Sequence, residues 1–93
     1  MPATHTPQAN PVKITVSGTS DNTIDLRYIL RGDTVLIEWV SGTAVQFNTQ
    51  GAIVASSATL NSTQTKLVLP AQSADYLYCK GGAGSETFIL TAL

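Results

Sequence analysis

Residues 34–40 read Thr-Val-Leu-Ile-Glu-Trp-Val, and this stretch indicates the fold class of the whole chain. Successive side chains of a β-strand point to opposite faces, so Val35, Ile37 and Trp39 share one face. The residues between them share the other face, and both faces are mostly apolar. This predicts a central strand, or a strand that is covered on its second side.

Outward from this strand, period-two alternation recurs in both directions along the chain. The alternating segments are residues 12–16, 24–30, 45–47, 53–55, 66–69, 76–80 and 87–92, while 56–60 fits either a helical turn or a further extended piece. Turn-forming residues separate them about every ten positions, and no segment carries a helical period of helical length. We therefore predict an all-β domain over residues 12–93, an antiparallel β-sandwich or small barrel of seven or eight short strands.

Three glycine-containing segments are interpreted as tight connections. Residues 41–43, Ser-Gly-Thr, predict a short hairpin loop, and residues 81–84, Gly-Gly-Ala-Gly, predict a hairpin loop or a gap around a neighbour. The second loop precedes a strand, whereas a phosphate-binding glycine loop precedes a helix. Arg31-Gly32-Asp33 spells the tripeptide that integrins read, but Gly and Asp also suit a plain turn, which is our interpretation.

Residues 1–11 form a polar leader, here called the arm, that contains three of the chain's four prolines and its single histidine. Three alternatives are open for the arm. It is a disordered leader, it folds along its own sheet, or it lies across a neighbouring subunit, which is the favoured hypothesis because an extended arm can add a strand to an open sheet edge. The residues expected to contact a partner are Pro2, Thr4, His5, Pro7, Gln8 and Pro11.

The composition excludes several classes of partner. Charged residues make up 12% of the 93 residues, about half the usual share, and the net charge is −1. The basic residues are scattered, so we expect no nucleic-acid binding. No apolar run is long enough for a membrane span, and no signal peptide is recognised, so we expect a protein made in a cytoplasm. Weak charge also favours association between copies.

Catalytic chemistry has little support in the sequence. His5 lies in the arm, where no fixed geometry positions it as a base, and most acidic residues lie in or beside turns. Glu38 is the one candidate carboxylate catalyst, although pairing with Arg27 or Lys13 across a sheet is favoured. Cys79 is interpreted as a buried hydrophobic residue. We predict no catalytic residue, no cofactor and no metal site, since no Cys/His cluster is present.

Two resemblances add to this interpretation. Residues 74–79, Ala-Asp-Tyr-Leu-Tyr-Cys, resemble the late strand of immunoglobulin domains, with Trp39 in the place of the core tryptophan, although the tyrosine is displaced and the partner cysteine is absent. As a whole, the small, weakly charged, Thr- and Ser-rich β chain with a polar arm resembles tailed-bacteriophage virion proteins of the capsid decoration (cement) type.

The second resemblance implies a structural protein on the capsid surface of a virion. Such a protein binds the major capsid protein and stabilises the assembled shell, often as a homotrimer. In that case the arm grips the capsid, and the apolar second face around Leu36 and Val40 serves packing between subunits.

Two alternatives belong to other functional classes. The first is a carbohydrate- or receptor-binding β module, such as a fibre or adhesin domain, which needs exposed aromatic side chains. The candidates are Trp39, Tyr28, Tyr76 and Tyr78, all of which we expect to serve the core because they lie in strand patterns. The second is a small hydrolase or inhibitor, which needs Glu38 or an Asp pair in a cleft.

Overall fold

The computed structural model describes residues 3–29, 34–49, 51–70 and 75–93, and these residues form nine β-strands and no helix. The strands are β1 (Thr4–His5), β2 (Val12–Thr15), β3 (Asn22–Asp25), β4 (Thr34–Ser41), β5 (Val45–Asn48), β6 (Ala58–Leu60), β7 (Lys66–Pro70), β8 (Tyr76–Gly81) and β9 (Thr87–Ala92). The predicted all-β class is confirmed. The strand beyond the expected number is β1, in the arm. The tripeptide at 31–33 lies outside the described residues.

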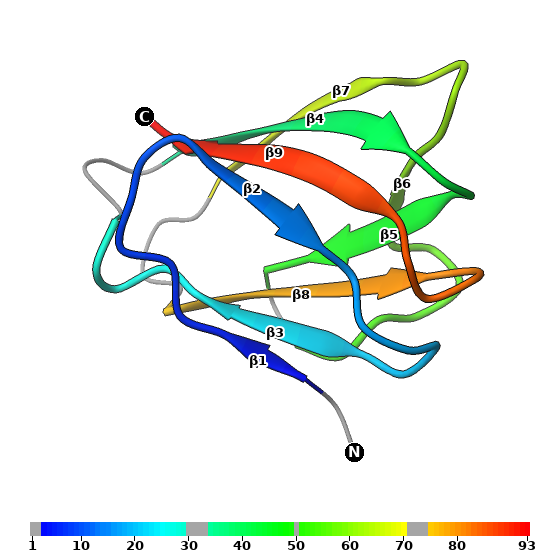
Figure 1. Ribbon diagram of the computed structural model, residues 1–93, viewed down its shortest axis with the longest axis horizontal. Coiled ribbons are helices and arrows are strands. Elements are labelled where there is room, and N and C mark those ends of the chain that lie inside the picture. Colours follow the sequence, from blue (N-terminus) through cyan, green and yellow to red (C-terminus); the bar gives the residue numbers. More distant parts are fainter. Residues whose placement is uncertain (1–2, 30–33, 50, 71–74) are drawn as a thin grey trace.

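The strands form two sheets that face each other across one core, which is a β-sandwich (Figure 1). Sheet A has the order β1-β3-β8-β5-β6, and sheet B has the order β2-β9-β4-β7. All strand pairs are antiparallel except β1 with β3. Strand β4, which the sequence predicted to be central, lies between β9 and β7.

Most connections between consecutive strands cross from one sheet to the other. Among the described strands, β5 and β6 are the one consecutive pair that forms a hairpin. The prediction of hairpin loops at residues 41–43 and 81–84 is therefore wrong, because each loop joins a strand of one sheet to a strand of the other. Short alternating segments give no sign of which partner each strand will take.

Mainly aliphatic side chains from both sheets fill the core. Phe47 of sheet A and Phe88 of sheet B meet edge to face, with ring centroids 4.9 Å apart and planes at 90°. Cys79 is fully buried in the same cluster, and Trp39 packs against it while half-buried. The two sheets are thus joined by direct contacts between their inner faces.

Two predicted strands end earlier or lie elsewhere than expected. The segment expected over residues 24–30 leaves the sheet after Asp25, whose carboxylate accepts a hydrogen bond from the Arg27 N–H at 2.9 Å. That turn is continued by the Ile29 N–H, which donates to the Leu26 carbonyl at 3.1 Å. Residues 53–55 lie in the loop that precedes β6, and the edge strand follows at residues 58–60.

Candidate functional site

The outer face of sheet B carries apolar side chains that do not enter the core. In the strand register, Leu36 of β4 lies between Thr91 of β9 and Val68 of β7. Val68 is 58% exposed and Val40 is 42% exposed, whereas Leu36 and Ile89 are half-buried. We call Leu36, Val40, Val68 and Ile89 the apolar face. The sequence identified its first two members, and the strand order adds the others.

A row of charged groups crosses the apolar face between Leu36 and Val40. Ile89 lies between Lys13 of β2 and Glu38 of β4, and Glu38 faces Lys66 of β7. The Lys66 Nζ and Glu38 Oε2 atoms are 4.0 Å apart, so the expected pairing of Glu38 with Arg27 or Lys13 is wrong. Lys13 lies on β2, which β9 separates from β4. Arg27 lies beyond the end of β3 and pairs with Asp25.

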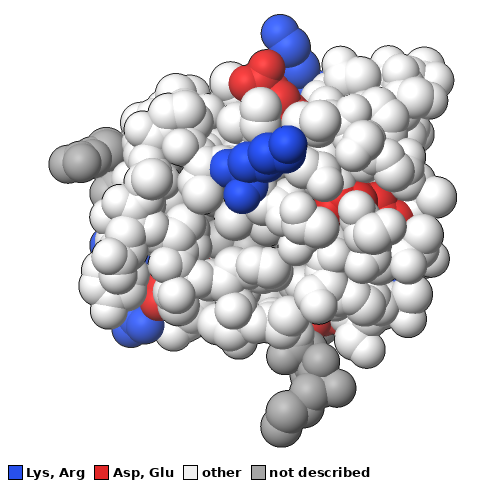
Figure 2. Space-filling model, in the orientation of Figure 1, with Lys and Arg blue, Asp and Glu red and all other residues white. Residues whose placement is uncertain are grey.

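The surface around these strands is sparsely charged. In Figure 2, a few separate Lys, Arg, Asp and Glu side chains stand among uncharged surface on the face shown. Charge repulsion between two such surfaces is weak, because isolated exposed charges are screened by salt. The face is therefore compatible with close contact against another uncharged protein surface.

The arm runs along its own domain in this single chain. The Thr23 N–H donates to the Ala3 carbonyl at 2.9 Å, and β1 then pairs with β3 at the edge of sheet A. At the other end of the arm, the Asn10 side chain exchanges two hydrogen bonds with the Ala92 backbone, at 2.8 and 2.9 Å. The arm thus contacts both sheets within this single chain, and its position in an assembly of several chains stays a prediction.

The expected partner-binding residues of the arm differ in accessibility. Thr4, Gln8 and Pro11 are exposed, His5 is half-buried, Pro7 is buried, and Pro2 lies outside the described residues. Contact of the exposed residues with another chain stays a prediction.

Asn22 explains why His5 is held at this edge. The Asn22 amide nitrogen donates to the Ser17 and Ser20 carbonyls at 2.9 and 3.1 Å. Its Oδ1 accepts from the Ser17 N–H at 3.0 Å and lies 2.9 Å from His5 Nε2. Since an amide oxygen only accepts, His5 Nε2 is the donor. His5 therefore ties the arm to a buried turn rather than serving as a base.

Glu86 forms a polar site that the sequence did not single out. Its side chain is fully buried, and its carboxylate accepts hydrogen bonds from the N–H groups of Ala83, Gly84 and Ser85 at 2.7 to 3.0 Å. The Thr43 hydroxyl donates a further bond from the other inter-sheet loop. Burial raises the pKa of Glu86, but these hydrogen bonds outweigh it and lower the pKa to about 2.

Glycines make room for this carboxylate. A Cβ added at Gly81 would overlap the Glu86 Oε1 atom, and one added at Gly42 would come within 2.9 Å of the Glu86 Cα and Cγ atoms. Gly42 also has a φ of 99°. The sequence signal was a glutamate directly after a glycine-rich loop. Because hydrogen bonds from its own loop satisfy it, Glu86 is a structural residue of the two crossing loops.

The described residues hold no group of three or more His, Cys, Asp or Glu side chains arranged to bind a metal ion. Cys79 is buried, and burial, with a smaller contribution from Asp21, raises the pKa of its thiol to about 12. Such a thiol is not a nucleophile at neutral pH. Glu38 lies on the outer face of β4, where Lys66 is its cross-strand neighbour, and not in a cleft.

The aromatic side chains are more accessible than the sequence indicated. Tyr28 is 63% exposed, so the expectation that it serves the core is wrong. It lies in the turn that follows β3, which the alternating pattern had placed inside a strand. Tyr76 and Tyr78 are half-buried on the outer face of sheet A, opposite the buried Leu77 and Cys79. Tyr28 is thus the exposed tyrosine, whereas the Arg27 guanidinium lies 5.3 Å from the centre of the half-buried Tyr76 ring.

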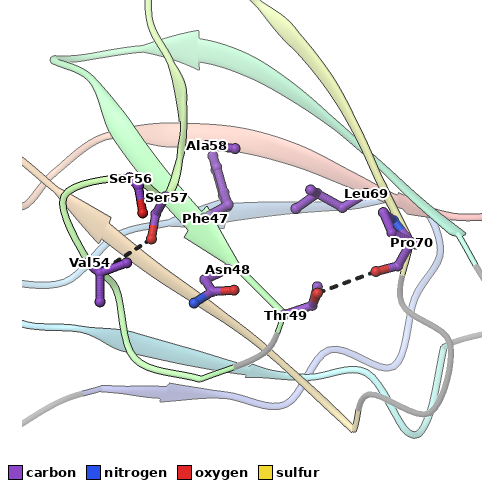
Figure 3. Close-up of a pocket in the computed structure, with 9 residues that line it drawn as sticks. All are labelled: Phe47, Asn48, Thr49, Val54, Ser56, Ser57, Ala58, Leu69 and Pro70. Atoms are coloured by element: carbon purple, nitrogen blue, oxygen red, sulfur yellow. Dashed lines mark hydrogen bonds between the residues drawn. The ribbon is translucent and has the colours of Figure 1, made fainter.

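Shallow depressions lie on the surface of the described residues. The first, of about 310 Å³, lies between the β5–β6 hairpin and the end of β7 (Figure 3). It is lined by Phe47, Asn48, Thr49, Val54, Ser56, Ser57, Ala58, Leu69 and Pro70, none of which is charged. The Ser57 hydroxyl accepts from the Val54 N–H at 3.0 Å, and the Thr49 hydroxyl donates to the Pro70 carbonyl at 3.3 Å. None of the lining side chains can act as an acid or a base at neutral pH.

The second depression, of about 350 Å³, lies on sheet A beside the end of β8. Its lining residues are Ala44, Gln46, Thr59, Lys80, Gly81 and Gly82.

No protein-family model, curated protein or solved structure matches this chain. Within the described ranges, the structure has no helix with the length and hydropathy to cross a membrane.

Proposed function

We propose that this protein is a structural virion protein that binds an assembled phage capsid and stabilises it without catalysis. The observation that carries the proposal is the apolar face, because Val40 and Val68 remain exposed on the outside of a sheet whose inner face already forms the core. Exposed apolar side chains on the outside of a sheet can serve as surfaces for protein contact. Packing between subunits of a homotrimer, or against the capsid, would bury them.

The proposed activity requires many weak contacts rather than one strong site. A decoration protein touches several capsid subunits at once, so its contacts act together and the apparent affinity exceeds that of each contact. Because it binds the assembled shell better than the free subunits, it stabilises the shell by mass action. A small sandwich with satisfied buried polar groups suits such a role.

In this proposal the arm contributes the contact that selects the major capsid protein. Strand β1 is the outermost strand of sheet A, so its free edge can accept a further strand from a partner. Its exposed Thr4, together with Gln8 and Pro11 further along the arm, lies on the surface that such a partner would meet.

The proposal is tested by deleting residues 2–10 and by the separate substitution Val68→Lys. The assay uses assembled capsids of the phage that the proposal implies as the source of this protein. We expect the truncated domain to fold but no longer to co-sediment with capsids. We expect the Val68→Lys protein to co-sediment less than the parent. Tyr28→Thr, an exposed change away from the apolar face, is the matched control. Normal decoration by the truncated domain and by Val68→Lys would show that the proposal is wrong.

A carbohydrate- or receptor-binding module is the second candidate function. The observation that favours it is the exposure of Tyr28, together with the half-buried Tyr76 and Tyr78 on the outer face of sheet A. Aromatic rings at a surface supply contact area with little loss of side-chain entropy. A glycan array with positive spots that are lost on replacement of one of these tyrosines would support this function.

A further inference from the structure

The outer face of sheet A differs in chemistry from the apolar face of sheet B. Its middle row contains Thr23, Tyr78 and Asn48 on three neighbouring strands, and the next row contains Lys80, Gln46 and Thr59. The side chains between these rows, among them Cys79 and Phe47, are buried. Hydroxyl, amide and ammonium groups therefore surround one aromatic ring, and we call these six residues the polar face.

A depression adjoins Tyr78 on this face. Gln46, Thr59 and Lys80 form its walls, and the backbone of Gly81 and Gly82 forms part of its floor. Lys80 follows Tyr78 by two positions on β8, which places the two side chains on the same face about 7 Å apart along the strand. A ring stacked on Tyr78 can therefore be linked to a second ring in the depression.

Position 81 requires a glycine because the Glu86 side chain occupies the space on the inner side of this residue. A Cβ at Gly81 would overlap the Glu86 carboxylate, so the buried glutamate occupies the space under this residue. The Gly82 N–H donates to the Ala44 carbonyl at 3.2 Å, which joins the two inter-sheet loops at the rim of the depression. The floor is held by backbone contacts and needs no ligand to form.

The local charge determines which ligands suit the depression. No ion pair joins Lys80 to another residue in the part of the chain that is described. The buried carboxylate of Glu86 lies next to Gly81 and is occupied by its own hydrogen bonds. Lys80 is the one charged side chain in the lining of the depression, and the amide, hydroxyl and backbone groups around it suit a neutral polar ligand.

We propose that the polar face binds a neutral oligosaccharide, with one pyranose ring stacked on Tyr78 and the next in the depression. The Lys80 ammonium and the Gln46 amide donate to sugar hydroxyls, and the Gln46 and Thr59 oxygens accept from them. The C–H groups of the first ring cover the tyrosine face, which removes apolar surface from water. This names a site for the second candidate function and rests on neither the apolar face nor the arm.

The test is a titration of the full chain, labelled with ¹⁵N, with maltotriose, cellotriose, N-acetylchitotriose or lactose at millimolar concentration. We expect at least one of them to shift the amide resonances of β5, β6 and β8 but not those of β4 and β7. Tyr78→Thr is expected to weaken that binding by about tenfold or more, and Lys80→Gln by several-fold. The matched control Lys13→Gln changes the same residue type on the opposite sheet and should leave the affinity unchanged.

Salt dependence separates the neutral ligand from an acidic one. Binding of a neutral sugar should be unchanged when the ionic strength is raised, whereas binding of sialyllactose through Lys80 would weaken. The proposal is overturned if none of the four sugars shifts the resonances of the polar face, if Tyr78→Thr binds as well as the parent, or if only sialyllactose binds. Each of these outcomes leaves the capsid test unaffected, because that test uses the arm and the opposite sheet.

Discussion

Glu86 is fully buried and is nevertheless ionised at neutral pH, because four donors surround its carboxylate. Three of them are backbone N–H groups of its own loop, and the fourth is the Thr43 hydroxyl of the loop between β4 and β5. Both loops connect sheet A with sheet B. The Glu86 side chain therefore joins the two inter-sheet loops by hydrogen bonds, and Gly42 and Gly81 leave the space that it occupies.

Glu86→Gln is expected to reduce the free energy of unfolding by about 3 kcal/mol. The amide removes the negative charge and places an NH₂ group against N–H donors, so at least one buried donor loses its acceptor. Urea unfolding followed by tryptophan fluorescence measures the change. The control Glu38→Gln, on the outer face of sheet B, should change stability by less than about 0.5 kcal/mol. Equal effects of the two substitutions would contradict the structural role of Glu86.

Acid should weaken the fold through the same carboxylate. The pKa of Glu86 falls from an ordinary 4.5 to about 2 in the folded chain, so its contribution is complete above pH 4.5 and is lost as the pH falls towards 2. Asp25, whose pKa is lowered by hydrogen bonds with Arg27, acts in the same direction. We expect the urea midpoint to fall between pH 4.5 and 2, and to fall less in Glu86→Gln. If the urea midpoints of the parent and of Glu86→Gln depended on pH in the same way, Glu86 would not be the cause of the acid sensitivity.

At the scale of elements, the arm is attached through a short strand and a few hydrogen bonds. Strand β1 forms two residue pairs with β3, and beyond them the arm is held by the His5–Asn22 and Asn10–Ala92 hydrogen bonds. A segment with so few contacts can exchange its own sheet edge for the same edge of a second copy at little cost. Such an exchange between copies would change which chain supplies the arm, while the sheet edge that the arm occupies stays the same.

The double substitution Thr4→Cys with Thr23→Cys tests that connectivity, because these residues are register partners on β1 and β3. In the isolated protein we expect an oxidised monomer on a non-reducing gel. If the arm crosses to a neighbour in the assembled state, the same variant gives covalent oligomers there. Thr4→Cys with Thr59→Cys is the control, since β1 and β6 lie at opposite edges of sheet A. Covalent oligomers in dilute isolated protein would contradict the packing of the arm on its own domain.

At the scale of the whole molecule, the sandwich presents two outer faces of unlike chemistry. The apolar face on sheet B suits contact with protein, while the polar face on sheet A offers an aromatic ring among amides and hydroxyls. The two faces lie on opposite sides of one core, so one molecule has room for a partner on each (Figure 1). Binding on one face therefore need not block the other.

The apolar face should control self-association. We expect the double variant Val40→Lys with Val68→Lys to remain monomeric at concentrations where the parent forms oligomers, as measured by sedimentation velocity. Both side chains are exposed, so the stability of the monomer should change by less than about 1 kcal/mol. The matched control places lysine at Tyr28 and Thr59, away from this face. An oligomer that persists in the Val40/Val68 variant would show that another surface holds the copies together.

Residue-level alternation was sufficient to predict the all-β class and the central position of β4. It also predicted that Leu36 and Glu38 share one face, because side chains alternate along a regular strand, whereas Val40 lies at a register shift between Trp39 and Ser41. The low charge of the surface and the inert, buried Cys79 follow from composition in the same way. These properties are local, and each can be read without knowing which strands pair.

Only the tertiary structure decided the properties that depend on strand partners. The loops at residues 41–43 and 81–84 cross between the sheets and lie next to each other. There the buried Glu86 carboxylate accepts a hydrogen bond from Thr43 of the first loop. Val68 joins Leu36 on the apolar face, and Tyr78 joins Gln46 and Lys80 on the polar face, because the strand register places them there. The physical reason is that pairing between distant strands is set by the burial of the whole core, which no single alternating segment contains.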